Sequence, residues 1–119
     1  MENLKEFLKF RKLKDFPEDV KTDEEKLKFV VEIVEEMFND AEDEDQDYEG
    51  DNIVQGFLIL MKYFNIKKVS IIDDYEFDGI YTIPIKDVLN KGITYRDIRK
   101  LIRLGWGLDD CTYEWLVAR

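Results

Sequence analysis

The chain has 119 residues, a length that suits one domain, and its apolar content of 45% is enough for a core. It carries 28 acidic and 18 basic residues, so its formal net charge is -10 at neutral pH. Such a charge repels nucleic acid and anionic membranes and favours a basic partner protein. Because the chain contains no His, catalytic triads and dyads that use an imidazole base are excluded.

The cysteine content and the apolar pattern bear on the cellular location. Cysteine occurs once, at Cys111, which excludes an intramolecular disulfide and a four-cysteine zinc site. The longest unbroken apolar run covers residues 57–61, far short of the ~20 residues that a membrane span needs. Residues 1–14 alternate charged and apolar side chains and lack the apolar core of a secretory signal. We therefore expect a cytoplasmic protein that needs no cofactor.

Three helices are predicted in the first half of the chain. Apolar residues at helical spacing indicate a short amphipathic helix over residues 3–13, which ends before Pro17. Thr22 and Glu25 form the pattern of a capping box, and the apolar positions from Leu27 to Ala41 form one stripe of a second helix. Residues 53–64 are apolar nearly all round, which predicts a third and centrally buried helix.

The second half mixes strands and helices. Residues 68–73 and 79–83 are rich in β-branched side chains and flank an acidic turn, so they predict a hairpin. A short helix is expected between Pro84 and Leu89, and Thr94 is expected to cap another that runs to Leu104. Alternation over residues 111–118 predicts a last strand. The fold class is therefore α+β, with N-terminal helices packed on a small antiparallel sheet of about three strands and helices inserted before the last strand.

The charge is distributed unevenly over this single predicted domain of residues 1–119. The helical part, residues 1–65, contains 19 acidic and 9 basic residues, whereas residues 66–119 contain 9 of each. All of the excess negative charge therefore belongs to the first part, and most of it is concentrated in one segment. Residues 40–51 contain 8 carboxylates in 12 positions.

Closely spaced carboxylates can imitate the charge density of a nucleic-acid backbone, about one charge per 1.7 Å of duplex. In charge and size, the chain resembles the small DNA-mimic inhibitors of phages and mobile elements, such as anti-CRISPR and anti-restriction proteins. It is also similar in these respects to immunity proteins that neutralise nuclease toxins. This resemblance is one of composition and covers no motif. It implies a non-enzymatic inhibitor that blocks a basic, nucleic-acid-handling partner.

On this hypothesis the contact residues are the acids around the end of the second helix and one aromatic side chain. Trp106 is included because its flanking glycines, Gly105 and Gly107, predict a partly exposed indole. The predicted partner-binding residues are Glu35, Glu36, Asp40, Glu42, Asp43, Glu44, Asp45, Asp47, Glu49, Asp51 and Trp106.

A DNA-binding regulator is the alternative hypothesis. The segment from Pro84 to Arg103 resembles a helix-turn-helix, with Gly92 in the turn. Asp87 and Lys91 depart from this pattern, because they occupy positions of the first helix that are usually apolar. A recognition helix would use four basic residues, which are Arg96, Arg99, Lys100 and Arg103.

Metal binding and catalysis receive weaker support from the sequence. Asp45, Asp47, Glu49 and Gly50 match the start of an EF-hand loop, but Gly56 stands where the bidentate Glu is required. The adjacent acids at positions 73–74 and 109–110 could hold Mg²⁺ only if both members of a pair faced one site, and neighbours in an extended segment face opposite sides. We therefore expect no metal site and no enzymatic activity.

Overall fold

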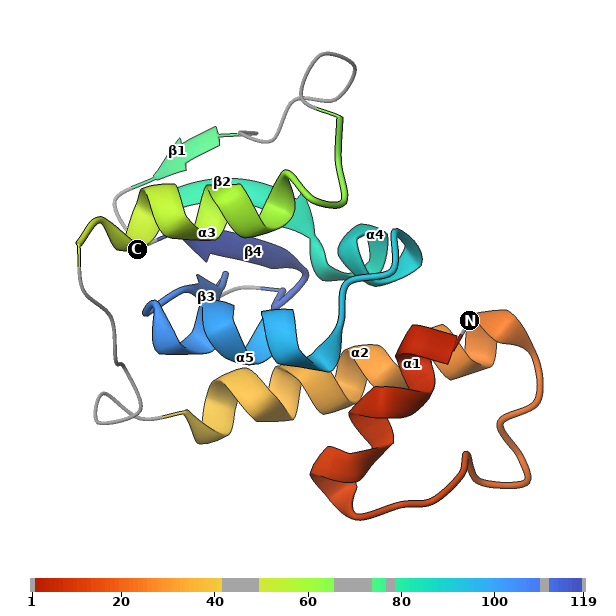
Figure 1. The fold of residues 1–119 in the computed structure, drawn as a ribbon. Helices are drawn as coiled ribbons and strands as arrows, with labels where there is room; N and C mark the ends of the chain where they lie inside the picture. Colours follow the sequence, from red (N-terminus) through yellow and green to blue (C-terminus); the bar gives the residue numbers. More distant parts are fainter. Residues whose placement is uncertain (1, 42–49, 66–73, 77–78, 110–111, 119) are drawn as a thin grey trace.

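The computed structural model describes residues 2–41, 50–65, 74–76, 79–109 and 112–118, and the fold is shown in Figure 1. The first half contains α1 (Glu2–Glu6), the 3₁₀ helix η1 (Phe7–Arg11), α2 (Asp23–Asp40) and α3 (Asn52–Leu60). The second half contains β1 (Asp74–Glu76), β2 (Gly79–Pro84), α4 (Ile85–Asn90), α5 (Tyr95–Arg103), β3 (Gly107–Leu108) and β4 (Trp115–Ala118).

The strands form one antiparallel sheet in the order β1-β2-β4-β3. At its centre, Tyr81 of β2 pairs with Val117 of β4, and the register shifts between Tyr81 and Pro84. The Thr82 hydroxyl, which is buried, donates to the carbonyl of Leu116 at 2.9 Å. The α+β class and the two helices inserted before the last strand are thereby confirmed, and the two-residue β3 adds one strand to the expected three.

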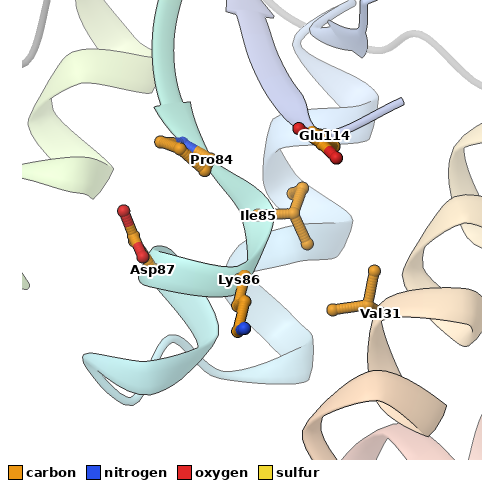
Figure 2. Close-up of a pocket in the computed structure, with 6 residues that line it drawn as sticks. All are labelled: Val31, Pro84, Ile85, Lys86, Asp87 and Glu114. Atoms are coloured by element: carbon orange, nitrogen blue, oxygen red, sulfur yellow. The ribbon is translucent and has the colours of Figure 1, made fainter. Parts of the chain in front are cut away.

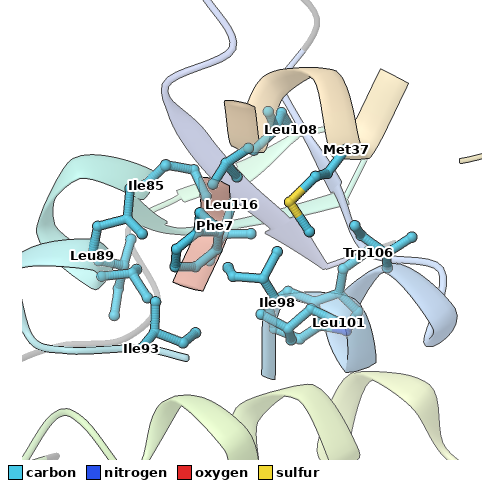
Figure 3. Close-up of a cluster of buried hydrophobic side chains, with 14 of the residues drawn as sticks. Phe7, Met37, Ile85, Leu89, Ile93, Ile98, Leu101, Trp106, Leu108 and Leu116 are labelled. Carbon is cyan, nitrogen blue, oxygen red and sulfur yellow. The ribbon is translucent and has the colours of Figure 1, made fainter. Parts of the chain in front are cut away.

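The core lies between the helices and the sheet. Figure 3 shows side chains from η1, α2, α4, α5 and the last two strands converging on one cluster, among them Phe7, Met37, Leu101 and Leu116. α2 packs on η1, α4 and β3, while α3 packs on α5. Burial of a large aliphatic or aromatic side chain stabilises a fold by about 1.5–3 kcal/mol, so this cluster supplies most of the driving force.

The N-terminus is part of this core. Leu4, Phe7 and Leu8 are almost completely buried. The side chain of Asn3 donates to the carbonyls of Leu89 at 3.1 Å and Ile93 at 3.4 Å, which joins α1 to the connection between α4 and α5. The expected single helix over residues 3–13 is instead divided into α1 and η1, and it ends at Lys12 in a left-handed conformation with φ 58°.

Two further expectations are corrected by the structure. α3 ends at Leu60 and is not buried all round, because its Gly56, Ile59 and Leu60 face the core while Val54, Leu58 and Met61 are exposed. The last strand begins only at Trp115, because the preceding residues turn around Asp109. The expected strand over residues 68–73 lies outside the described residues.

Candidate functional site

The candidate site begins with α2, whose sequence separates an apolar face from an acidic one. The Thr22 hydroxyl accepts the backbone N–H of Glu25 at 3.1 Å, and the Glu25 carboxylate accepts the N–H of Thr22 at 3.2 Å. This capping box starts the helix, and burial of one apolar stripe holds it against the core. The buried residues of that stripe are Leu27, Val30, Ile33, Val34 and Met37.

Carboxylates occupy the outer side of the C-terminal half of α2. Glu32 and Asp40 are exposed, and Glu35 and Glu36 are partly exposed. Their positions, at intervals of three and four residues, place them on one side of the helix. The last turn of α2 contains no basic residue. Because the C-terminus of a helix carries partial negative charge, each acid near it is unfavourable by about 0.3–1 kcal/mol when exposed.

Glu35 carries part of this unfavourable charge. Burial raises the pKa of Glu35, and the nearby Glu32 carboxylate raises that pKa further. Both effects disfavour the ionised form. A cationic group placed against Glu35 would relieve this repulsion, as Arg11 already does in part for Glu32.

Glu36 is used by the fold itself. Arg11 of η1 donates through Nε to one carboxylate oxygen of Glu36 at 3.0 Å and through Nη2 to the other. The guanidinium group also lies over the Phe29 ring, 5.0 Å from its centroid. The hydrogen bond from Arg11 is the main reason that the pKa of Glu36 is lowered. Glu36 therefore joins η1 to α2 and has less capacity for an external partner than Glu35 or Asp40.

The acidic run after α2 is only partly within the described residues. Asp51 is exposed and caps α3, because its carboxylate accepts the N–H groups of Ile53 at 3.0 Å and Val54 at 3.1 Å. Glu42, Asp43, Glu44, Asp45, Asp47 and Glu49 lie outside the described residues. Figure 1 shows that α2 ends and α3 begins on the same side of the molecule. The described acids Asp40 and Asp51 therefore belong to the two ends of one strongly acidic segment.

The expectation that Trp106 is partly exposed is wrong. Its side chain is only 3% exposed, and its indole Nε1 donates to the carbonyl of Asn52 at 3.1 Å. The ring meets Phe57 edge to face, with centroids 5.5 Å apart. A Cβ atom at Gly56 would lie 2.2 Å from the indole, so the glycine makes room for the ring. The flanking glycines that suggested exposure accompany close packing, and Trp106 is a core residue.

The four predicted DNA-binding residues do lie on the outer side of α5. Arg96, Arg99, Lys100 and Arg103 are all exposed, while Ile98, Leu101 and Ile102 of the same helix are buried. None of the four takes part in the ion pairs found in the described ranges, which involve Lys5, Arg11 and Lys62. α4, however, packs mainly on α2 and β2, and α5 mainly on α3. The main contacts of these two helices are therefore with other elements.

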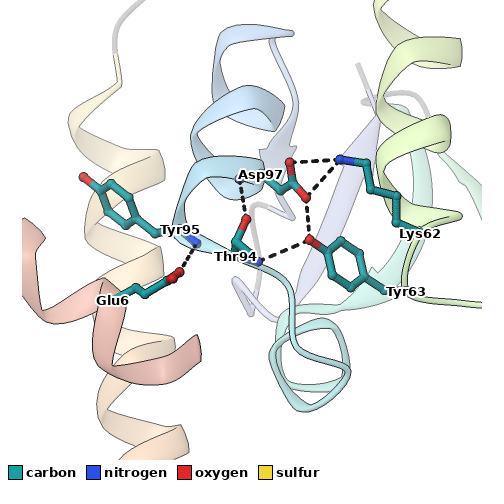
Figure 4. Close-up of polar contacts among 6 residues, drawn as sticks. All are labelled: Glu6, Lys62, Tyr63, Thr94, Tyr95 and Asp97. Carbon is teal, nitrogen blue, oxygen red and sulfur yellow. Dashed lines mark hydrogen bonds and ion pairs between the residues drawn. The ribbon is translucent and has the colours of Figure 1, made fainter. Parts of the chain in front are cut away.

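A polar cluster that the sequence did not reveal joins α3 to α5, as Figure 4 shows. Asp97 is 5% exposed and receives hydrogen bonds from Lys62 at 3.2 and 3.3 Å and from the Tyr63 hydroxyl. The backbone N–H of Thr94 donates to the same hydroxyl at 3.4 Å. Burial and the Asp97 carboxylate both raise the pKa of Tyr63, so the phenol stays protonated. The sequence feature that could have pointed to this cluster is Lys62, the single cation in an otherwise apolar segment.

Asp109, one of the acids considered for Mg²⁺, has a structural role. It is 3% exposed, and its carboxylate accepts the N–H groups of Thr112 and Trp115, each at 2.9 Å, and the Thr112 hydroxyl at 2.8 Å. Burial alone would raise the pKa of Asp109, but these hydrogen bonds outweigh it and hold the pKa below its ordinary value. Within the described ranges, no group of three or more Cys, Asp or Glu residues is placed to hold a metal ion.

A pocket of about 280 Å³ lies between α2, the start of α4 and the residue before β4, as Figure 2 shows. Val31, Pro84 and Ile85 line it together with three charged residues, Lys86, Asp87 and Glu114. The charged side chains point in different directions and do not converge on a common point.

Comparison of the chain with protein-family models, with curated proteins and with solved structures finds no match. In the part of the chain that the structure describes, no helix has the length and apolarity needed to cross a membrane.

Proposed function

We propose that the protein is a non-enzymatic inhibitor that binds a basic, nucleic-acid-handling protein through the acidic side of α2 and the acidic run that follows it. The observation that carries this proposal is the placement of carboxylates toward the C-terminus of α2 with no basic residue in its last turn. Asp40 in that turn opposes the helix dipole and therefore lowers the stability of the fold. A ligand-binding role accounts for charge that the fold itself does not use.

The proposed mechanism is occupation of the partner's nucleic-acid channel. Carboxylates along α2 and residues 40–51 would take the positions of backbone phosphates against the partner's Lys and Arg side chains. The net charge of -10 would steer the encounter, so association would be fast and would slow as salt is added. No covalent step is involved, and the inhibitor would be released unchanged.

The test combines affinity capture from a host lysate with an inhibition assay. The wild-type protein is compared with a bait in which Asp43, Glu44, Asp45 and Asp47 are changed to Asn or Gln. We expect the wild type alone to retain a nucleic-acid-handling enzyme, and we expect purified wild type to inhibit that enzyme. Equal recovery and equal inhibition by both baits would contradict the proposal. A nuclease toxin among the captured proteins would indicate an immunity protein, and a defence complex would indicate an anti-defence inhibitor.

Binding of duplex DNA through α5 is the second candidate function, and the exposed row of four basic residues favours it. Phosphates would be contacted by Arg96, Arg99, Lys100 and Arg103. An electrophoretic mobility assay at low salt, with the double variant Arg99→Ala/Arg103→Ala, tests it. Duplex binding that is lost in this variant would support the alternative, whereas no binding by the wild type would eliminate it.

A further inference from the structure

The exposed apolar residues of α3 and of its C-cap, Met61, form a continuous row on one surface. Val54, Leu58 and Met61 are 52%, 56% and 43% exposed, and they recur at intervals of four and three residues. This spacing repeats the seam through which one helix packs on another in a coiled coil. The row extends over about 10 Å of helix, because each residue adds about 1.5 Å.

The fold does not require apolar residues at these positions. The opposite face of α3 already supplies Gly56, Ile59 and Leu60 to the interior. Polar side chains in place of Val54, Leu58 and Met61 would leave that face intact. Apolar side chains grouped on an exposed surface usually mark a site of interaction, whereas isolated ones do not.

The surroundings of the row define the charge of its occupant. Asp51, exposed and directly before α3, caps the helix, and it is the last of the 8 carboxylates of residues 40–51. At the other end, Lys62 is already paired with the buried Asp97. An occupant must therefore combine an apolar strip with positive charge. A second copy of the chain is disfavoured, because two molecules of net charge -10 repel each other.

We infer that the row of Val54, Leu58 and Met61 is the docking surface for a basic amphipathic helix of the partner protein. This inference rests on the proposed function and adds an apolar contact to the electrostatic one. The partner helix would lay its apolar side along α3 and direct its Lys and Arg side chains toward the exposed Asp51 at the start of that helix. The apolar contact would supply affinity that salt does not remove, and the carboxylates would supply the rate of association.

The test uses a synthetic peptide of about five helical turns, with Leu on one side and Lys on the other, and a scrambled peptide of the same composition. Binding is measured by isothermal titration to the wild type, to Leu58→Ser/Met61→Ser, and to Leu13→Ser. Leu13 is the matched control, because it is also an exposed aliphatic residue, at 38%, but lies outside α3. Urea denaturation of each variant verifies that the fold is retained.

We expect the wild type and Leu13→Ser to bind the amphipathic peptide at least about tenfold more tightly than the scrambled one. The α3 double variant should lose that preference and keep only the salt-sensitive binding common to both peptides. Equal preference in the double variant would overturn the docking surface without affecting the proposed function, which is tested by neutralising the acidic run. Failure of the wild type to prefer the amphipathic peptide would also overturn the docking surface. So would self-association of the wild type, measured by sedimentation, if the double variant abolished it.

Discussion

α2 and α5 begin alike and end differently. Each starts at a Thr whose hydroxyl accepts the N–H of an acidic residue three positions on, Glu25 in α2 and Asp97 in α5, both at 3.1 Å. The last turn of α5 contains Lys100 and Arg103, whereas the last turn of α2 contains no basic residue and ends at Asp40. The start of each helix therefore follows the requirements of helix stability, and only α5 follows them at its end.

The difference between the two last turns bears on the function of the acidic surface of α2 and the basic surface of α5. Cations near the C-terminus of a helix stabilise it by about 0.3–1 kcal/mol each, so Lys100 and Arg103 of the basic row have a structural explanation, which Arg96 in the first turn lacks. Asp40 at the end of α2 has none, since it opposes the same dipole, whereas Glu36 is paired with Arg11. Charge that lowers stability needs another reason to be present, and this argument favours a binding role for α2 over one for α5.

The largest expected effect comes from the packing just after α5, which contributes to stability independently of the charges on that helix. Trp106→Ala should lower the free energy of unfolding by about 3–5 kcal/mol, because it removes a buried indole that packs on Gly56 and Phe57. Urea denaturation measures the loss. The control is Tyr113→Asn, at an exposed aromatic residue with φ 60°, where Asn is tolerated and the change should stay within about 0.5 kcal/mol.

The two acidic residues that follow the capping threonines should differ in importance. Asp97→Ala should cost about 1–3 kcal/mol, because it leaves Tyr63 and Lys62 without their buried acceptor. Glu25→Ala affects an exposed residue and should cost less than about 0.5 kcal/mol. Thermal unfolding of both variants checks the difference. Equal losses would mean that the cluster around Asp97 adds nothing beyond helix capping.

The charges at the two helix ends should have effects of opposite sign. Asp40→Asn should raise the free energy of unfolding by about 0.3–1 kcal/mol, and Arg103→Gln should lower it by a similar amount. Both differences should shrink as salt is added, because the two side chains are exposed. Urea denaturation at two salt concentrations measures them. A loss of stability in Asp40→Asn would remove the argument that the end of α2 is unfavourable.

The smallest expected effect concerns pH. Burial and Glu32 raise the pKa of Glu35, so its ionised form destabilises the folded state above that pKa. Glu35→Gln should therefore be slightly more stable than the wild type at pH 7. The advantage should vanish as the pH falls through the raised pKa toward the unfolded value of about 4.3. Unfolding measured from pH 7 to pH 4 tests this.

Asp109→Asn is the matched control, because its effect on the free energy of unfolding should have the opposite sign to that of Glu35→Gln. Because its hydrogen bonds hold the pKa of Asp109 below the ordinary value, the ionised form stabilises the folded state. The variant should be less stable than the wild type above the unfolded value of about 3.9, and the deficit should fade as the pH falls through the lowered pKa. Parallel pH dependence in both variants would contradict the assigned directions.

Local signals in the sequence predicted the helices well. The pair of Thr22 with Glu25 and the capping residue Thr94 specified the starts of α2 and α5, because capping depends only on residues within one turn. The α+β class followed from periodicity in the same way. β3 could not be predicted, since a strand of two residues, Gly107 and Leu108, carries no period.

The candidate site was predictable in composition and less so in detail. The acids were evident from the sequence. The two hydrogen bonds from Arg11 to Glu36, however, join residues of separate elements, so no local sequence pattern predicts them. Trp106 was misjudged because Gly105 and Gly107 say nothing about Gly56, whose missing side chain accommodates the indole. The exposure of Leu58 was missed because an apolar helix shows no preferred face in sequence.

The junction between Asn3 and the carbonyls of Leu89 and Ile93 bears on how the protein is made. Asn3 is held by residues 86 and 90 positions further along the sequence, and β2 must wait for β4 before the sheet closes. Contacts of such long sequence separation form late. This core can therefore assemble only after the residues through β4 have been synthesised. Removal of α1 should therefore be more damaging to this core than its short length suggests.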